Sequence, residues 1–295
     1  MKFANVVIGG HKEVIIKLPN ESFKLSDISK IIQGDIPLIT STDELIRFNF
    51  DIGKIEQAIT DNFDELKKKE ISNDASFGFL PCVENPSKII CVGLNYRRHA
   101  LEEGVAIPKE PVLFGKFNNS LAGHLEHIKI PVESKEMDYE GEMGIVIGKE
   151  CSHVSSKDAL DYVYGYFVAN DVSARDLQFK SSQWLLGKSM DKFAPIGPWV
   201  VTAGDVRDPD SLQLKTFVNG ELRQNSNTSD MIFNTRELIS YISKFFTLHP
   251  NDIILTGTPE GVIQGMPDSK RMWLRKGDKV EVEIEQLGKL ENTFV

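Results

Sequence analysis

The sequence predicts a mixed α/β protein that is mostly β, with a small N-terminal α+β subdomain ahead of a larger β-rich domain. Three observations lead to this prediction. Short apolar runs of strand length dominate the chain from residue 88 onward, helical periodicity is confined to a few segments, and strands and helices do not alternate regularly. Regular alternation would indicate a doubly wound parallel sheet, so we expect a different β architecture.

Helical signals in the first 80 residues define the small subdomain. Residues 26–34 have Ser26 at a suitable N-cap position and Gly34 at the far end, which predicts a short helix. Apolar side chains then recur at helical spacing and are followed by three lysines, which we interpret as a solvated helix end. These positions are Ile55, Ala58, Ile59, Phe63 and Leu66, followed by Lys67, Lys68 and Lys69.

A polar stretch at 72–76, followed by Pro81 and Pro86, marks the boundary between the two parts of the chain. We therefore predict a subdomain over residues 1–80 and a larger domain over residues 81–295. Several segments of the larger domain have the composition of strands, and the last of them alternates strictly between apolar and charged side chains. These segments are 88–93, 143–148, 163–168, 252–255 and 280–285.

Only two segments of the larger domain show helical signals. One starts near Ser156 and carries Leu160 and Val163. The other covers 236–246, where apolar side chains at helical spacing are expected to face inward. Those side chains are Leu238, Ile239, Ile242, Phe245 and Phe246.

Composition excludes several classes of function. The chain has 295 residues with 34 Lys and Arg against 43 Asp and Glu, a net charge of −9. An acidic protein of this kind is a poor candidate for binding nucleic acid or an anionic membrane surface. No stretch approaches the roughly 18 apolar residues of a membrane span, and the apolar N-terminal stretch is too short for a signal peptide. Three cysteines without CxxC spacing favour a reducing, cytoplasmic compartment.

Acidic residues at strand ends are the first candidates for chemistry. Glu140 and Glu142 would share one face of a strand, with Asp138 beside them if the strand extends that far. Two carboxylates on one face repel each other unless a hard cation lies between them. Asp171 follows an apolar strand and is a candidate third oxygen ligand. The alternatives are a solvated strand face for the glutamates and a helix cap for Asp171.

Three further segments carry polar groups that suit catalysis. His99 and Glu102 would meet on a helix as a general base, or form an ordinary surface pair. Lys188 has apolar neighbours and could stabilise a developing oxyanion, or simply extend its charge to solvent. The turn at 256–261 offers backbone N–H groups to an anion, or is only a turn.

These motifs, taken together and in this order, resemble the fumarylacetoacetate hydrolase family over roughly residues 86–295. The first 75 or so residues resemble the variable N-terminal extension of many members. The blocks that carry the resemblance are 92–96 with His99 and Glu102, 138–142, 170–176, 187–189 with 195–198, 218–221, 231–233 and 256–259.

The resemblance implies a mostly β roll, a homodimer and a role for each matching residue. It implies a divalent metal on three carboxylates, with Mg²⁺ expected first and Mn²⁺ or Ca²⁺ as alternatives. Some members have an aspartate where Asn95 stands here, so waters are expected to complete the metal shell. The implied ligands are Glu140, Glu142 and Asp171; the implied catalytic residues are His99, Glu102 and Lys188; the implied substrate-binding residues are Arg175, Gln178 and Thr258.

The function implied is metal-dependent hydrolysis of a C–C bond in a 2,4-diketo acid of the acylpyruvate type. Such a reaction would release a 2-keto acid and a carboxylate, with His99 and Glu102 activating water. Three alternatives remain open: oxaloacetate decarboxylation, keto–enol or double-bond isomerisation of a dioic acid, and a non-catalytic metal-binding role. The expected partner is a small 2-keto acid, and neither nucleic acid nor a membrane is expected.

Overall fold

The computed structural model describes residues 1–31, 39–71 and 78–295, and its centre is one large mixed sheet. Its strand order is β3-β2-β1-β14-β11-β10-β17-β5-β6, and β4 also pairs with β1. All neighbours are antiparallel except β17 and β5. The strands are β1 (Lys2–Ile8), β2 (His11–Lys17), β3 (Ser22–Lys24), β4 (Gly78–Phe79), β5 (Ile89–Gly93), β6 (Val112–Lys116), β10 (Gly141–Ile147), β11 (Val163–Asn170), β14 (Val200–Thr202) and β17 (Ile253–Leu255).

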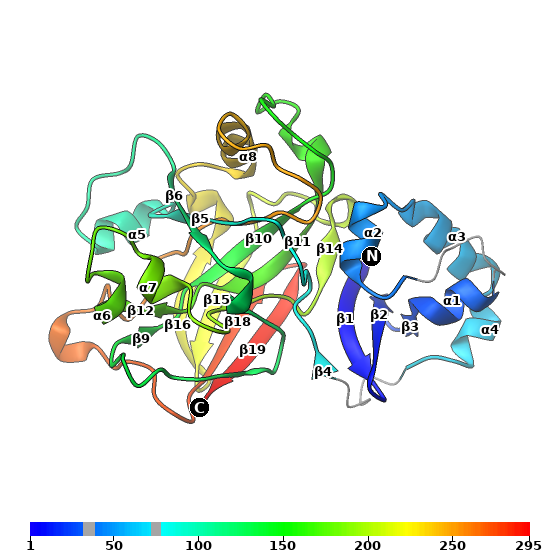
Figure 1. Ribbon diagram of the computed structural model, residues 1–295, viewed down its shortest axis with the longest axis horizontal. Coiled ribbons are helices and arrows are strands. Elements are labelled where there is room, and N and C mark those ends of the chain that lie inside the picture. The colour runs from blue at the N-terminus through cyan, green and yellow to red at the C-terminus, as the bar shows by residue number, and fades with distance from the viewer. Residues whose placement is uncertain (32–38, 72–77) are drawn as a thin grey trace.

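A second, five-stranded sheet lies against β10 and β11 and completes the predicted mostly β roll (Figure 1). The two sheets approach each other closely at Gly141, because a Cβ there would lie 2.3 Å from Thr216 Oγ1. The strands of the second sheet, in spatial order, are β16 (Glu221–Asn227), β15 (Gln213–Val218), β18 (Lys279–Ile284), β19 (Gly288–Phe294) and β8 (His127–Ile128). Two small pairs are β12 (Ser173–Ala174) with β9 (Met137–Asp138) and β13 (Ala194–Pro195) with β7 (Leu121–Ala122).

The N-terminal part lies at one end of the molecule, where helices cover β1 to β3 (Figure 1). It has its own apolar core, which includes Phe3, Phe23 and Leu45. Because β1 also pairs with β14, this part extends the large sheet, and the boundary at residue 80 stays a prediction. Its helices are α1 (Leu25–Ile31), α2 (Thr42–Arg47), α3 (Ile52–Asp61) and α4 (Phe63–Lys67).

Two details of the N-terminal helices differ from expectation. The first helix begins at Leu25, so Ser26 lies inside it, while Gly34 and the polar stretch at 72–76 are outside the described residues. The second predicted helix is two helices separated at Asn62. The Asn62 side chain donates to Ala58 O at 2.9 Å, a local bond that competes with helix continuation.

The two helices predicted in the larger domain have different outcomes. The segment after Ser156 forms only a 3₁₀ turn, Ala159–Tyr162, because Val163 already belongs to β11. The other helix is α8 (Thr235–Ser243), which begins with a capping box between Asn234 and Glu237. Its inward-facing side chains at 238, 239 and 242 are buried as predicted. Phe245 and Phe246, beyond its end, are 64% and 47% exposed, so their predicted inward orientation was wrong.

Three short helices of the larger domain show no periodicity in the sequence because each is only four to six residues long. They are α5 (Arg97–Glu102), α6 (Arg175–Gln178) and α7 (Leu185–Lys188). All three lie at the end of the molecule opposite the N-terminal part (Figure 1). The remaining 3₁₀ turns are Asn118–Ser120, Ala203–Asp205, Thr228–Asp230 and Asp268–Lys270. In the described ranges, no helix combines the length and apolar character needed to cross a bilayer.

Candidate active site

Three buried carboxylates meet where β10 and β11 run side by side. Gly141 pairs with Asn170 across the two strands, so Glu140 and Asp171 adjoin, and Asp171 N donates to Glu140 O at 2.9 Å. Glu142 lies within β10, two residues after Glu140. The nearest carboxylate oxygens of Glu140, Glu142 and Asp171 all lie within 4.8 Å of one another. The structure therefore brings together the three residues expected to hold a metal.

Asp138 does not join this cluster. The strand β10 begins only at Gly141, and Asp138 belongs to β9, where it is fully buried. Its Oδ2 accepts a hydrogen bond from Arg175 Nε at 2.9 Å. Asp138 is thus a partner of Arg175 rather than a fourth carboxylate of the cluster.

Three buried cations surround two of the three carboxylates. Lys188 Nζ lies 2.8 Å from Glu140 Oε2 and 3.0 Å from Asp171 Oδ2. Arg175 Nη1 lies 2.7 Å from Glu140 Oε1, and Lys116 Nζ lies 2.6 Å from Asp171 Oδ1. Lys188 is buried, so it does not extend its charge to solvent. Lys116 was missed in the sequence, although a single lysine ending an apolar strand was the signal available.

The three carboxylates are compensated unequally. Burial opposes ionisation of Glu140, but Lys188 and Arg175 outweigh it and lower the pKa of Glu140 to about 2. Burial, together with the charges of Asp171 and Glu140, raises the pKa of Glu142 well above its usual range. Glu142 Oε2 accepts from Gly257 N at 2.8 Å, and within the described ranges no cationic side chain forms an ion pair with it.

A hard divalent cation fits this donor set. The cluster presents only carboxylate oxygens, which Mg²⁺, Mn²⁺ and Ca²⁺ prefer. Of the three carboxylates, Glu142 is the one without an ion-pair partner among the described residues, and a cation bound among the three would stabilise its ionised form. The alternative of a solvated strand face is wrong, because all three side chains are buried.

His99 and Glu102 meet on α5, as their spacing predicts. His99 is 6% exposed, so the pair is not a surface pair, and its Nδ1 lies 3.4 Å from Glu102 Oε2. Gly261 N donates to Glu102 Oε1 at 3.0 Å, which fixes the carboxylate from the other side. Glu103 brings a further carboxylate oxygen within 4.8 Å of this pair. The arrangement is that of a histidine oriented by a carboxylate.

The turn at 256–261 binds the protein's own carboxylates. Gly257 N donates to Glu142 and Gly261 N donates to Glu102, so one turn links the carboxylate cluster to α5. Thr258 Oγ1 donates to Gly141 O at 3.0 Å and accepts from Gln224 Nε2 at 2.8 Å. The turn therefore does bind anionic groups, as predicted, and these are two carboxylates of the protein itself.

Asn95 is occupied by bonds to the backbone. Its Nδ2 donates to Thr256 O at 2.8 Å and to Phe233 O at 3.0 Å, and its Oδ1 accepts from Phe233 N at 2.9 Å. Asn95 therefore holds the segments at Phe233 and Thr256 in place. The expectation that water completes the metal shell stays a prediction.

A cavity of about 190 Å³ lies beside several of these groups. Its polar wall includes all three expected substrate-binding residues, two of the three expected catalytic residues and one expected ligand; these are Arg175, Gln178, Thr258, His99, Lys188 and Glu140. Glu102, Glu142 and Asp171 do not line it.

The apolar wall of the cavity includes Phe114 and Trp184, whose rings meet edge to face at 5.2 Å. Gly93 makes room for Trp184, because a Cβ at Gly93 would lie 2.6 Å from the ring. Glu103 and Gln264 also line the cavity, and sequence reasoning did not single them out.

Comparison with known proteins gives consistent results. A family model described as fumarylacetoacetate (FAA) hydrolase C-terminal matches residues 88–295. The chain is 50% identical over 218 residues to a rat protein named oxaloacetate tautomerase Fahd2a, mitochondrial, covering 74% of this chain and 69% of that protein.

Solved structures extend the similarity to the whole chain. A fumarylacetoacetate hydrolase from Exiguobacterium antarcticum superposes with a TM-score of 0.84 at 30% identity, covering 100% of this chain and 99% of that one. Maleylpyruvate hydrolase from Sphingobium sp. SYK-6, in complex with manganese(II) and pyruvate, superposes with a TM-score of 0.78 at 29% identity, with the same coverage.

Proposed function

The chain belongs to the fumarylacetoacetate hydrolase family, and on that basis we propose that it is a divalent-metal-dependent enzyme of small 2-oxo acids whose reaction is the keto–enol tautomerisation of oxaloacetate. The observation that carries the proposal is the placement of His99, an acid–base group, on a small cavity that Arg175 and Lys188 also line. The relatives named oxaloacetate tautomerase support the choice of substrate.

The cation-rich lining suits the head of a 2-oxo acid. Arg175 and Lys188 are cations on the cavity wall, and Gln178 and Thr258 add polar groups beside them. Burial would lower the pKa of Lys188, but Asp171 and Glu140 raise it, so the lysine stays charged. A divalent cation held by Glu140, Glu142 and Asp171 would supply a Lewis acid that stabilises the enolate form of the substrate.

His99 is the group that would move the proton. In the enol-to-keto direction, the enol O–H gives up its proton and C3 receives one, so the two tautomers differ only in the position of a proton and a double bond. His99 would carry this proton, since one nitrogen of an imidazole can accept a proton and the other can donate one. Glu102, fixed by Gly261 N, would hold the ring in one orientation, and Lys188 would stabilise the negative charge on oxygen.

Hydrolysis of a C–C bond in a 2,4-diketo acid is the second candidate. The pair formed by the buried His99 and the partly buried Glu102 favours it, because the same pair could take a proton from water. Hydroxide would then attack the distal carbonyl, and C–C cleavage would yield a 2-keto acid and a carboxylate. A structural neighbour that is named a maleylpyruvate hydrolase supports this candidate.

Several properties of the protein remain part of the proposal. Mg²⁺ is the ion we propose first, with Mn²⁺ or Ca²⁺ as alternatives; manganese(II) is the ion named in one structural neighbour. A homodimer and a cytoplasmic location also stay predictions, and several relatives carry the word mitochondrial in their names.

Product analysis with two substrates separates the candidates. Enol-oxaloacetate and acetylpyruvate are each incubated with the metal-loaded protein, and pyruvate is quantified while the enol absorbance is followed. A tautomerase speeds loss of the enol absorbance of oxaloacetate without forming pyruvate. Pyruvate from acetylpyruvate alone would replace this proposal with the hydrolase, and pyruvate from oxaloacetate would replace it with a decarboxylase.

A further inference from the structure

Asp138 is a buried carboxylate that lies outside both the carboxylate cluster and the cavity lining. Backbone N–H groups hold it on both oxygens. Oδ1 accepts from Tyr139 N and Ile263 N, each at 2.9 Å, and Oδ2 accepts from Gln264 N at 3.0 Å. Since these donors belong to the backbone, the orientation of the carboxylate is fixed independently of any side chain.

This fixed carboxylate holds one edge of the Arg175 guanidinium. Arg175 Nε and Nη2 each lie 2.9 Å from Asp138 Oδ2. On the other edge, Nη1 lies 2.7 Å from Glu140 Oε1 and 3.0 Å from Gln178 Oε1. The guanidinium is thus held between a carboxylate that does not line the cavity and two residues that do.

We propose that Asp138 is a positioning residue that orients Arg175 for the substrate and acts through Arg175 alone. The inference rests on the proposed function in one respect, namely that Arg175 meets a substrate in this cavity. Without Asp138, the guanidinium keeps its partners on the Nη1 edge but loses the contact that fixes its rotation. Fixing a binding group before the substrate arrives is worth more than the contact itself, because no reorganisation is then needed.

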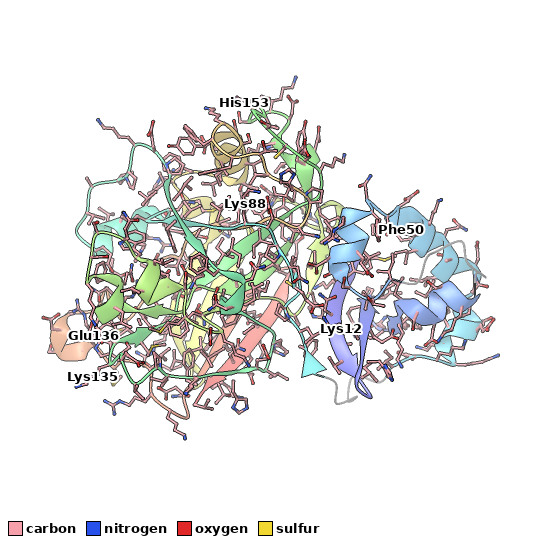
Figure 2. The ribbon with its side chains drawn as sticks, in the orientation of Figure 1. Lys12, Phe50, Lys88, Lys135, Glu136 and His153 are labelled. Atoms are coloured by element: carbon pink, nitrogen blue, oxygen red, sulfur yellow. The ribbon has the colours of Figure 1, made fainter. Side chains whose placement is uncertain are left out.

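The same carboxylate also sets where the 263–264 segment lies. Gln264 lines the cavity, and its backbone N–H is bonded to Asp138. The guanidinium and this part of the cavity wall are therefore held relative to one another by one side chain. Arg175 N is held from the same region, since it donates to the backbone O of Glu136 at 2.9 Å; Figure 2 labels Glu136 and Lys135 at the end of the molecule where α6 lies.

A double-mutant cycle tests this role. We expect Asp138→Asn to lower kcat/KM by about 10- to 100-fold, the usual effect of losing a group that orients a ligand-binding residue. We expect Arg175→Ala to cost at least as much, and the double variant to be no worse than Arg175→Ala. If the two losses multiply, Asp138 acts independently of Arg175 and the proposal is overturned.

The matched control is Asp176→Asn, on the helix α6 that also carries Arg175. The Asp176 carboxylate also accepts two hydrogen bonds, from Ser134 Oγ at 2.7 Å and Lys135 N at 2.9 Å, but it does not contact Arg175. This substitution should keep kcat/KM within about threefold of its parent protein, whether the parent is the wild type or Arg175→Ala.

Chemical rescue gives a readout that a purely structural role would not move. Guanidinium ion at low millimolar concentration should raise the activity of Arg175→Ala at least about tenfold, because Asp138 and Glu140 still form its binding site. The double variant should show no rescue. Equal rescue in both variants, or rescue in neither, contradicts the proposal.

A second substitution keeps the test decisive if Asp138→Asn does not fold. Arg175→Lys retains the charge but has one nitrogen, which cannot reach Asp138 and Glu140 together as the guanidinium does. We expect it to be as impaired as Arg175→Ala, and near-wild-type activity would overturn the proposal. All ratios are measured with whichever 2-oxo acid the wild type turns over, so failure of the proposed reaction shows in the wild type alone.

Discussion

Gly257 donates its backbone N–H to Glu142 Oε2 at 2.8 Å, and only glycine suits that position. Its φ is +94°, and a Cβ there would lie 2.9 Å from both Val92 O and Asn95 Cβ. The same turn reaches Glu102 through Gly261, so the backbone of one loop orients a member of the carboxylate cluster and a member of the histidine pair. The geometry of the candidate site therefore depends on that loop conformation.

Substitution of Gly257 should therefore damage stability and metal binding together. We expect Gly257→Ala to lower the free energy of unfolding by about 1–3 kcal/mol, because it combines a strained φ with a steric clash. Urea unfolding measures the loss. Gly220→Ala is the control, since Gly220 has a φ of +82° in open space and carries the strain alone. Equal losses for the two variants would contradict the role given to the close packing of Gly257.

His99→Asn should lower kcat by about 100- to 10,000-fold, because it removes the group to which we assign the proton transfer. Glu102→Gln should lower kcat less, by tenfold or more, since it only loosens the orientation of the imidazole. Steady-state kinetics gives both values, and calorimetric titration with Mn²⁺ should show unchanged metal affinity. A His99→Asn variant with wild-type kcat would remove His99 from the mechanism.

Lys116→Met should be strongly destabilising, although Lys116 does not line the cavity. Its Nζ contacts Asp171 Oδ1 at 2.6 Å and also donates to Phe193 O at 2.8 Å, in a fully buried setting. Removing one partner of a buried pair leaves an uncompensated charge, which costs about 3–5 kcal/mol. Lys192→Met is the control, because its pair with Glu126 is partly exposed to solvent and should contribute less than about 1 kcal/mol. If the two variants lose similar free energies of unfolding in urea, the fold does not depend on the pairing of Lys116 with Asp171.

His124 should make the fold sensitive to acid. Burial lowers the pKa of His124 to about 4, and its Nδ1 accepts from Glu291 N at 3.0 Å, a bond that requires the neutral ring. The unfolded chain, with an ordinary histidine pKa near 6.5, binds more protons than the folded one between about pH 4 and 6.5. Stability is therefore full above pH 6.5 and falls as the pH drops toward 4.

The measurement compares wild type with His124→Gln at pH 7 and pH 5. Between these values the wild type should lose about 2 kcal/mol more than the variant in urea unfolding. The same pH dependence in both proteins would show that other groups dominate acid unfolding.

The sequence predicted the parts of the site that depend on local pattern. Glu140 immediately precedes β10 and Glu142 lies within it, Asp171 follows the strand that pairs with β10, and His99 and Glu102 are one helical turn apart. These relationships follow from strand and helix periodicity. The family resemblance supplied the roles, and the family match over 88–295 confirms the membership on which they rest.

The parts that sequence missed depend on contacts between distant segments. Lys116 reaches Asp171 from β6, and Asp138 turns away from its neighbours to hold Arg175. Gln264 lines the cavity because its loop is bonded to Asp138. Helix prediction failed near Ser156 and at Phe245 because strand pairing and the early end of α8 outweighed the local apolar pattern.

The measurement that tests the central claim most directly is the rate of enol-oxaloacetate ketonisation by metal-depleted protein, before and after addition of Mg²⁺ or Mn²⁺. The account predicts a rate near background without metal, recovery on adding it, and no recovery in a folded Glu140→Ala variant. A rate that is unchanged by chelation, or a Glu140→Ala variant that recovers like the wild type, would contradict it.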